Sequence, residues 1–282
     1  MSPSRVVLIT GCSSGIGRAT AERLARAGWT VYATARRLAS IAELELAGCR
    51  LLELDVTDER SMQTAVEAVE QAEGAVGVLV NNAGYSLSGA IESVPLAEVR
   101  QQFETNVFGL VRLSQLVLPG MRAQGCGRIV NVSSMGGRLT FPGGGYYHAT
   151  KHAVEALSDA LRFEVAGFGI DVVVIQPGLI RTSFADAAVG TIADRSGDPE
   201  GPYDVFNQTV AAVTSAAYRN ASSRILGGGP DVVARTIERA LDARHPRTRY
   251  RVTPSAAVFL TLRRLLPDRA WDALVGRTYP KP

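Results

Sequence analysis

The chain has 282 residues, of which 46% are hydrophobic and 20% charged, a composition that favours a folded globular protein and excludes a disordered one. The formal net charge of +3 at pH 7 is small, so it gives no reason to expect a nucleic acid as partner. Cys12, Cys49 and Cys126 are far apart, and with the three histidines they form no metal-ligand pattern. We therefore expect free thiols and no metal site.

The first residues lack the apolar stretch of a secretory signal, and no apolar run is long enough to cross a membrane. We expect a soluble, cytoplasmic protein with reduced thiols. The apolar segment 256–266 is interpreted as a packed amphipathic helix, with a membrane anchor as the alternative.

Short apolar runs alternate with helix-like stretches along the chain. Strands are predicted at residues 5–10, 29–35, 50–54, 77–80, 128–133, 170–176 and 249–252, and helices at 15–28, 61–73, 97–122, 146–166 and 230–243. Such alternation implies right-handed βαβ units. We therefore expect an α/β fold with one doubly wound parallel sheet and helices on both faces. No linker separates two halves, so residues 1–282 are interpreted as a single domain.

The alternation of strands and helices stops after the sixth predicted strand. Residues 182–224 are rich in Ala, Ser, Asp and Gly, and a segment of this length without clear secondary structure is commonly functional. We interpret it as a segment that covers the substrate. Phe184, Tyr203 and Phe206 are its candidate pocket residues, and simple packing is the alternative. Residues 254–282 form a C-terminal tail.

A glycine-rich turn, Thr10-Gly11-Cys12-Ser13-Ser14-Gly15-Ile16-Gly17, lies between the first predicted strand and the first helix. Glycines here let the backbone approach a pyrophosphate closely, and the free N–H groups of the helix face the anion. The spacing is GxxxGxG instead of GxGxxG, and a glycine turn can also be a simple loop. Its position directly after an apolar strand favours a dinucleotide site.

Arg36 and Arg37 follow the second predicted strand, where an NAD-binding protein would place an acidic residue against the adenosine ribose. A guanidinium can instead hold a 2′-phosphate through paired, charge-assisted hydrogen bonds. The sequence therefore predicts a preference for NADP(H), with NAD(H) possible. Two solvated surface arginines are the alternative interpretation.

Tyr147 and Lys151 are four residues apart on a predicted helix, so their side chains face the same side. A tyrosine hydroxyl can protonate a carbonyl oxygen if a nearby positive charge lowers its pKa. We therefore take Tyr147 as the candidate acid/base and Lys151 as the group that tunes it. Tyr146 has no lysine at this spacing, and His148 and His152 are interpreted as packing or surface residues.

These residues and several others resemble, in order, the motif set of the short-chain dehydrogenases/reductases. The motifs are residues 10–17, Asn81-Asn82-Ala83-Gly84, Asn106, Ser134, Tyr147-x-x-x-Lys151 and Pro177-Gly178. The resemblance covers roughly the first two thirds of the chain. It implies a Rossmann-like sheet of about seven strands, and a homodimer or homotetramer.

The resemblance also implies roles for the matching residues. The catalytic set is Asn106, Ser134, Tyr147 and Lys151. The cofactor-binding set is Gly11, Ser13, Ser14, Gly15, Ile16, Gly17, Arg36, Arg37, Asp55, Val56, Asn82, Ala83, Gly84, Tyr147, Lys151, Pro177, Gly178, Ile180 and Thr182. Ser14 departs from the pattern, because NADP-preferring members often carry a basic residue there.

Some of these roles are specific. By the resemblance, Asp55 and Val56 flank the adenine, and Thr182 contacts the nicotinamide carboxamide. Residues 82–84 form a supporting turn. Lys151 also bonds the nicotinamide ribose.

The other two catalytic residues complete the site that the resemblance implies. Ser134 orients the substrate oxygen, with Ser133 as the competing candidate. Asn106 holds a water in the proton relay to Lys151.

Within the family, the stretch YYHATKHAVEALSDALRFEV and the later RYRVTP and LRRLLPDR resemble the branch of hydroxysteroid and retinol dehydrogenases. This implies an oxidoreductase that acts on CH–OH donors and interconverts a lipophilic alcohol with a ketone or aldehyde. An epimerase or dehydratase, an NAD-preferring dehydrogenase, and a catalytically silent NADP(H)-binding regulator are the alternatives. The intact set of Ser134, Tyr147 and Lys151 disfavours the silent regulator.

Overall fold

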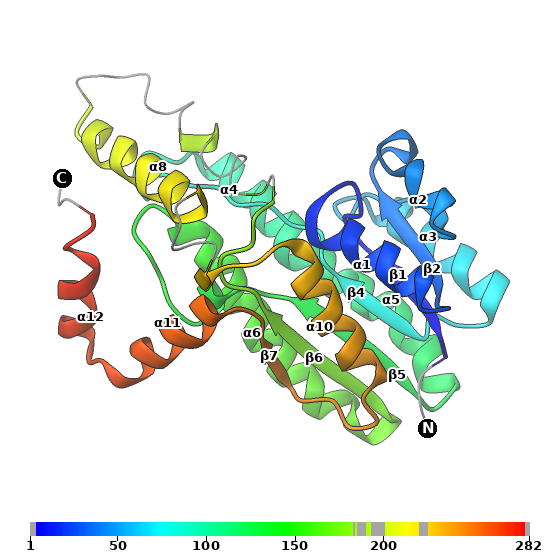
Figure 1. Cartoon of the computed structure of the whole chain (residues 1–282). Helices are drawn as coiled ribbons and strands as arrows, with labels where there is room; N and C mark the ends of the chain where they lie inside the picture. The colour runs from blue at the N-terminus through cyan, green and yellow to red at the C-terminus, as the bar shows by residue number, and fades with distance from the viewer. Residues whose placement is uncertain (1–3, 183, 185–189, 193–200, 220–224, 280–282) are drawn as a thin grey trace.

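The computed structural model describes residues 4–182, 184, 190–192, 201–219 and 225–279. Within these residues, seven strands form one parallel sheet in the order β3-β2-β1-β4-β5-β6-β7 (Figure 1). The strands are β1 (Val6–Ile9), β2 (Thr30–Ala35), β3 (Arg50–Glu53), β4 (Val78–Asn81), β5 (Gly127–Val132), β6 (Ile170–Gln176) and β7 (Arg249–Arg251). The predicted doubly wound sheet is confirmed.

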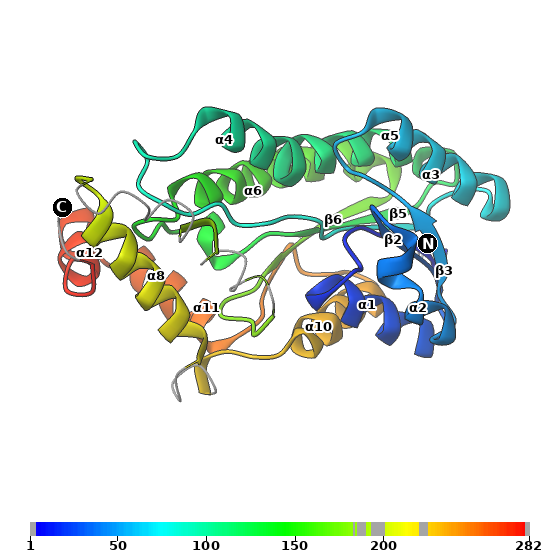
Figure 2. The same ribbon diagram turned by 90° about the horizontal axis from the view of Figure 1, so that it is seen from above.

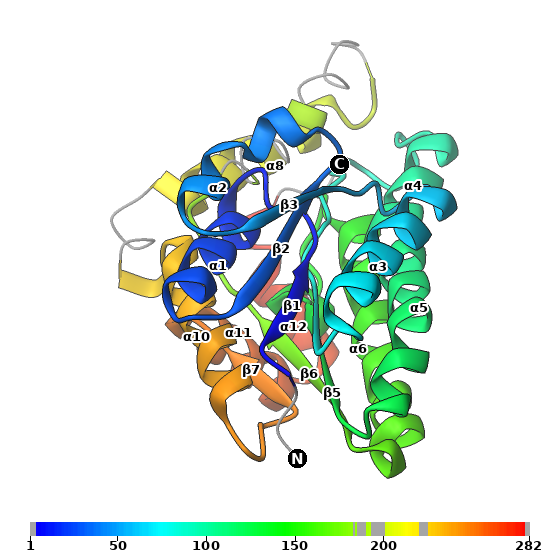
Figure 3. The same cartoon turned by 90° about the vertical axis from the view of Figure 1, so that its right-hand side faces the viewer.

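Helices cover both faces of the sheet, as Figures 2 and 3 show. On one face lie α1 (Gly15–Arg26) and α10 (Pro230–Asp242), and on the other lie α3 (Glu59–Glu73), α5 (Gly109–Ala123) and α6 (Gly145–Val165). Alternate residues of β1 supply the two cores: Val7 and Ile9 pack into the first, and Val6 and Leu8 into the second. Because both faces are covered, the central strands are apolar throughout.

Helix ends follow local capping. Helix α3 begins at Glu59, two residues before its predicted start, because the Asp58 carboxylate accepts a hydrogen bond from the main-chain N–H of Ser61 at 2.8 Å. Helix α1 is followed by Gly28 at φ +78°, the residue expected to stop it. The remaining short elements are α2 (Glu43–Leu46) and the 3₁₀ turns η1 (Leu38–Ile41), η3 (Met135–Gly137) and η4 (Ala166–Phe168).

The long helix expected over residues 97–122 is present, but it is not α-helical throughout. The structure has α4 (Leu96–Phe103), then a π-helical turn η2 (Glu104–Phe108), and only then α5. The main-chain N–H of Gly109 bonds the carbonyl of Glu104, five residues back. Such π turns occur mostly at functional sites, and this one carries Asn106.

The segment after β6 also differs from expectation. Residues 204–219, expected without secondary structure, form helix α8 (Asp204–Arg219). The tail folds into α11 (Pro254–Leu265), as expected, and a further helix α12 (Asp268–Val275) that was not predicted. Leu260 and Trp271 of these helices pack on Leu139, in the loop after β5. Within the part of the chain that the structure describes, no helix is long and apolar enough to cross a membrane.

Candidate active site

The candidate residues lie at the carboxyl ends of β1, β4, β5 and β6, the edge of the sheet where an open α/β fold binds its ligands. The glycine turn follows β1, residues 82–84 follow β4, Ser134 follows β5, and Pro177 follows β6. The strand order reverses between β1 and β4. A crevice for a dinucleotide is expected at this reversal.

The glycine turn has the backbone that a pyrophosphate site needs. Gly11 has φ +71°, a conformation that favours glycine. A Cβ at Gly17 would lie 2.3 Å from the carbonyl oxygen of Gly11, so no side chain fits there. Ser13 and Ser14 are exposed, and the first turn of α1 holds no acidic residue. The turn therefore suits the anionic part of a dinucleotide, whose phosphates would meet the N–H groups of α1.

Asn82 ties the turn to the end of β4. Its side-chain Nδ2 donates to the carbonyl oxygens of Thr10 at 2.9 Å and Gly11 at 3.1 Å. In return, the Thr10 hydroxyl accepts from the main-chain N–H groups of Asn82 and Ala83, each at 2.9 Å. Asn82 and Ala83 thus shape the turn, and a Cβ at Gly84 would be 3.0 Å from Asn106 Oδ1.

The residues expected around the adenosine lie after β2 and β3. Arg36 and Arg37 are exposed, and neither guanidinium forms an ion pair with another described residue. The Asp55 Oδ1 accepts from both the main chain and the hydroxyl of Thr57, at 2.9 and 2.8 Å. Val56 is buried. The two arginines are available to an anionic ligand, whereas Asp55 is held in a fixed orientation.

The residues expected around the nicotinamide lie in the loop after β6, and this loop contacts the glycine turn. Thr182 Cγ2 would be 3.3 Å from a Cβ built on Gly15. The carbonyl of Pro177 accepts from the main-chain N–H of Met135 at 2.8 Å, which links this loop to the one after β5. Gly178 packs so closely on Ser255 that a Cβ would be 2.3 Å from its hydroxyl oxygen, and Ile180 is buried.

Helix α6 brings Tyr147 and Lys151 together, as their spacing predicted. Lys151 is buried, its Nζ donates to the Val132 carbonyl at 2.9 Å, and it lies 5.9 Å from the centre of the Tyr147 ring. Burial lowers the pKa of Lys151 to about 8, against the opposing effect of the Glu155 carboxylate. The site therefore holds a lysine whose charge depends on its neighbours.

Tyr147 itself does not have the lowered pKa that its position beside Lys151 led us to expect. Burial of the hydroxyl raises its pKa, and a hydrogen bond with the Ser134 hydroxyl acts in the opposite direction. Desolvation disfavours the phenolate, so in this structure it outweighs the neighbouring groups. The Tyr147 hydroxyl therefore carries its proton at neutral pH.

Ser134 and Ser133 were competing candidates, and the structure separates them. The Ser134 hydroxyl lies near enough to the Tyr147 hydroxyl to lower its pKa, and the Ser134 Oγ accepts from the main-chain N–H of Gly136 at 3.0 Å. The Ser133 Oγ is buried without a hydrogen-bond partner among the described residues. Geometry thus places Ser134, and not Ser133, beside the proposed acid.

Asn106 is buried in the π turn, and its side chain holds neighbouring segments. Its Oδ1 accepts from the main-chain N–H of Tyr85 at 3.0 Å, and its Nδ2 donates to the Tyr85 carbonyl at 2.9 Å and to Thr150 Oγ1 at 3.1 Å. The amide therefore joins the loop after β4 to α6. These contacts hold the Asn106 side chain in a fixed orientation.

The two histidines beside the tyrosine have structural contacts. His148 is buried, its Nδ1 lies 3.1 Å from the Gly136 carbonyl, and burial lowers its pKa to about 4. It is therefore neutral near pH 7 and its Nδ1–H donates to that carbonyl. His152 is exposed, with a ring nitrogen 2.9 Å from the His148 carbonyl.

The candidate pocket residues divide into two groups. The Phe184 ring lies edge-on to Tyr147, with centroids 5.5 Å apart. Tyr203 instead donates from its hydroxyl to Glu92 at 2.7 Å, and Phe206 contacts Tyr203. Only Phe184 of the three is in contact with the proposed acid. Residues 183, 185–189, 193–200 and 220–224 of the expected covering segment lie outside the described residues.

Sequence analysis missed two charged residues near the site, Glu155 and Arg249. The Glu155 carboxylate is buried and bonds Arg249 at 2.9 Å. The signal for Glu155 was present, since it is four residues after Lys151 in the same helical row. Nothing in the sequence pairs it with Arg249, which lies 94 residues away.

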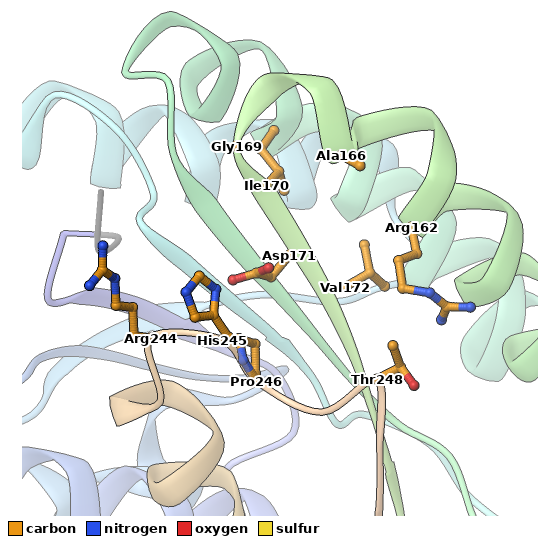
Figure 4. A pocket seen from close by; sticks show the side chains of 10 residues that line it. All are labelled: Arg162, Ala166, Gly169, Ile170, Asp171, Val172, Arg244, His245, Pro246 and Thr248. Atoms are coloured by element: carbon orange, nitrogen blue, oxygen red, sulfur yellow. The ribbon is translucent and has the colours of Figure 1, made fainter.

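A pocket of about 480 Å³ lies at the opposite end of the sheet (Figure 4). Asp171 and His245 line it, near the start of β6, whereas Tyr147 and Ser134 lie beyond the carboxyl ends of the strands. The Asp171 carboxylate is already bonded by Arg128 at 2.7 Å. This pocket is therefore separate from the candidate active site.

Comparison with known proteins shows a family and several relatives. A family model described as short chain dehydrogenase matches residues 5–191. The 3-ketodihydrosphingosine reductase of Bacteroides thetaiotaomicron is 36% identical, over 94% of this chain and 94% of that protein. The NADPH-dependent 3-dehydrocapnine reductase of Ornithobacterium rhinotracheale is 35% identical over 98% of both chains. Retinol dehydrogenase 16 of Rattus norvegicus is 33% identical, over 99% of this chain and 90% of that one.

Solved structures indicate the same family. A short-chain dehydrogenase from Streptomyces avermitilis has a TM-score of 0.80 and 36% identity, over 97% of this chain and 98% of its own. A short-chain dehydrogenase/reductase from Burkholderia phymatum in complex with NAD has a TM-score of 0.78 and 27% identity, over 99% of this chain and 98% of its own. A serine dehydrogenase complexed with NADP+ has a TM-score of 0.75 and 26% identity, over 88% and 94%. The chain belongs to the short-chain dehydrogenase/reductase family, whose members are oxidoreductases that act on CH–OH groups with a nicotinamide cofactor.

Proposed function

We propose that this protein is an NADP(H)-dependent reductase and dehydrogenase that interconverts a lipophilic alcohol with its ketone or aldehyde, using Tyr147 as acid and base. The observation that carries the proposal is the arrangement of Ser134, Tyr147 and Lys151. The Ser134 hydroxyl lies near enough to the tyrosine hydroxyl to lower its pKa, and Lys151 lies one helical turn away beside the same ring. The glycine turn that suits a dinucleotide lies at the same edge of the sheet.

Each of the three residues has a distinct task in this proposal. The bound nicotinamide supplies or accepts the hydride. Tyr147 gives its proton to the carbonyl oxygen in reduction and removes it from the alcohol in oxidation. Ser134 donates to the oxygen as negative charge develops. Lys151 favours the tyrosinate through its positive charge, with Asn106 in the proton relay behind it.

The preference for NADP(H) rests on Arg36, with Arg37 in support. Both follow β2 and are free of ion pairs with other described residues, so a 2′-phosphate can recruit them. One relative is named an NADPH-dependent reductase, which supports the preference. A preference for NAD(H) is the competing proposal, since Ser14 provides no basic side chain.

The proposal of a lipophilic substrate rests on the aromatic contact at Tyr147 and on the relatives. Phe184 covers the proposed acid, and Tyr218 of α8 lies near enough to raise the pKa of the Tyr147 hydroxyl. Relatives are named for retinol and for ketodihydrosphingosine, both lipophilic molecules. We propose that residues 182–224 cover such a substrate.

Oligomeric state and location complete the proposal. We propose self-association into a homodimer or homotetramer, and the exposed Phe108 on η2 and Phe163 on α6 are candidate contacts for it. The cysteines are free and buried, in keeping with a reducing cytoplasm.

The decisive experiment compares Tyr147→Phe with Tyr146→Phe in NADPH oxidation against ketones, aldehydes and steroids. Tyr146 is the matched control, because its hydroxyl donates to the Ile91 carbonyl at 3.1 Å instead of contacting Ser134. We expect Tyr147→Phe to lose at least about 100-fold in turnover and still to bind NADPH, and Tyr146→Phe to stay active. Unchanged turnover in Tyr147→Phe contradicts the proposed acid. Binding of NADPH by a wild type that turns over no substrate favours the silent regulator.

A further inference from the structure

Glu155 is a buried carboxylate that the proposed mechanism does not use. Its side chain is 4% exposed. Oε1 accepts from Gln176 Nε2 on β6 at 2.9 Å, and Oε2 accepts from Arg249 Nε on β7 at 2.9 Å. A buried carboxylate without partners is costly, so this one is anchored by both of the last two strands of the sheet.

Tyr147, Lys151 and Glu155 form one row along α6, because each is four residues from the next. Side chains on a helix lean toward its N-terminus, so Glu155 leans toward the turn of Lys151. The turn η3 packs tightly on this row: a Cβ at Gly137 would be 2.8 Å from the Lys151 carbonyl and 2.9 Å from Glu155 Cγ. Little room is left for water beside the carboxylate.

The other groups near this row leave Glu155 as the anion next to Lys151. The ionisable residues around Lys151 and Glu155 are Tyr147, His148, His152, Asp159 and Arg162 on α6, Tyr85 after β4, Tyr218 on α8 and Arg249 on β7. The polar residues that pack here, Ser133 after β5, Asn106 on η2 and Gln176 on β6, are uncharged. Asp159 is one turn farther from Lys151, and it is paired with Arg162 and Arg249 at 2.7 Å each.

We propose that Glu155 is a positioning residue that keeps Lys151 in its charged form behind the Tyr147 hydroxyl, and that Arg249 fixes the carboxylate in that place. This inference rests on the proposed acid/base role of Tyr147. Burial lowers the pKa of Lys151 to about 8, and the Glu155 carboxylate opposes that fall. An uncharged Lys151 cannot favour the tyrosinate. The last strand thereby contributes to a catalytic site that it does not touch.

The test is the pH profile of kcat/KM for ketone reduction between pH 6 and 10, in Glu155→Gln and in Asp159→Asn. The change Glu155→Gln keeps the shape of the side chain and removes its charge. Without that charge Lys151 loses its proton at a lower pH, so we expect the alkaline limb to move down by about one pH unit. Asp159→Asn is the matched control, because it removes a carboxylate that is also paired with Arg249 but lies farther from Lys151. The alkaline limb of the Asp159→Asn profile should not move.

The outcomes separate a functional role from a structural one. A fall in melting temperature with an unmoved alkaline limb in Glu155→Gln overturns the proposal, as does an equal shift in Asp159→Asn. Glu155→Asp, which restores a carboxylate, should recover the wild-type limb. If Glu155→Gln does not fold, Glu155→Gln/Arg249→Gln removes both charges and leaves none unpaired. Its limb should also lie below that of the wild type, and an unmoved limb overturns the proposal.

The turnover of Tyr147→Phe shows whether a negative result refutes only the role of Glu155 or also the proposed role of Tyr147. Turnover that survives in Tyr147→Phe defeats both, because no tyrosine then depends on Lys151. Turnover lost in Tyr147→Phe, together with an unmoved limb in Glu155→Gln, defeats the role of Glu155 alone.

Discussion

A Cβ at Gly17 would lie 2.3 Å from the carbonyl oxygen of Gly11, and 2.6 Å from Asn82 Nδ2. No side chain can fit at that distance, so α1 and the turn before it approach each other as closely as their backbones allow. The same approach leaves the N–H groups of α1 accessible to an anion. We therefore expect this one contact to support both the stability of the fold and the binding of the cofactor.

The substitution Gly17→Ala is expected to weaken both the stability of the fold and the binding of NADPH. The turn or the helix must move to admit the methyl group, which should cost about 1–3 kcal/mol in the free energy of unfolding. The displaced N–H groups should raise the Kd for NADPH by at least tenfold, about 1.4 kcal/mol. Gly167→Ala is the control, because no atom lies within 4 Å of its Cβ. Chemical denaturation and fluorescence titration measure the two effects, and normal NADPH affinity in a destabilised Gly17→Ala contradicts the shared contact.

Arg36→Ala tests the cofactor preference. Loss of a charge-assisted contact to the 2′-phosphate should raise the Kd for NADPH about tenfold or more and leave the Kd for NADH unchanged. Arg100→Ala, on the exposed face of α4, removes the same charge away from β2 and should change neither value. Equal losses for both cofactors, or better efficiency with NADH in the wild type, count against NADP(H).

Ser134→Ala and Ser133→Ala form a natural pair. The Ser134 hydroxyl lies near the Tyr147 hydroxyl and is the proposed donor to the substrate oxygen, so its removal should lower kcat by about 100-fold or more, as removal of an oxyanion donor does. The Ser133 hydroxyl is buried without a partner among the described residues, so its removal should leave kcat intact and the stability equal or higher. Steady-state kinetics and thermal unfolding of the two variants decide the matter. A larger loss in Ser133→Ala reverses the assignment.

The sequence predicted the sheet well because apolar, β-branched runs mark strands that are buried on both faces. It predicted Tyr147, Lys151 and Ser134 because their chemistry follows short, ordered motifs. It could not predict the π turn at Asn106, since one inserted residue in the hydrogen-bond ladder leaves the apolar spacing of a helix almost unchanged.

Other features of the structure could not be predicted because they depend on contacts between residues that are far apart in the sequence. Helix α8 was missed because small and polar residues dominate its surroundings, and its packing partner is elsewhere: Val210 lies 2.4 Å from the position of a Cβ at Gly143. The raised pKa of Tyr147 was missed because the i,i+4 spacing reports the lysine and not the burial. The bond between Glu155 and Arg249 joins a helix to the last strand, which no local pattern records.

His148 should make the stability of the protein depend on pH in a defined window. Burial lowers its pKa from 6.5 to about 4, so as the pH falls through this range the unfolded chain takes up a proton that the folded one does not. Stability due to the neutral imidazole is complete above pH 6.5 and is lost toward pH 4. The loss should be about 3 kcal/mol from this residue.

The comparison of His148→Gln with the wild type isolates this contribution. Denaturant unfolding at pH 7 and pH 4.5 should show a smaller drop in free energy for His148→Gln, even if the variant is less stable at both values. His245→Gln is the control, because that side chain is exposed at the opposite end of the sheet and should not alter the drop. Equal drops in the wild type and His148→Gln mean that the imidazole gains its proton without losing its bond to Gly136. The turn that carries Ser134 would then tolerate a charged histidine.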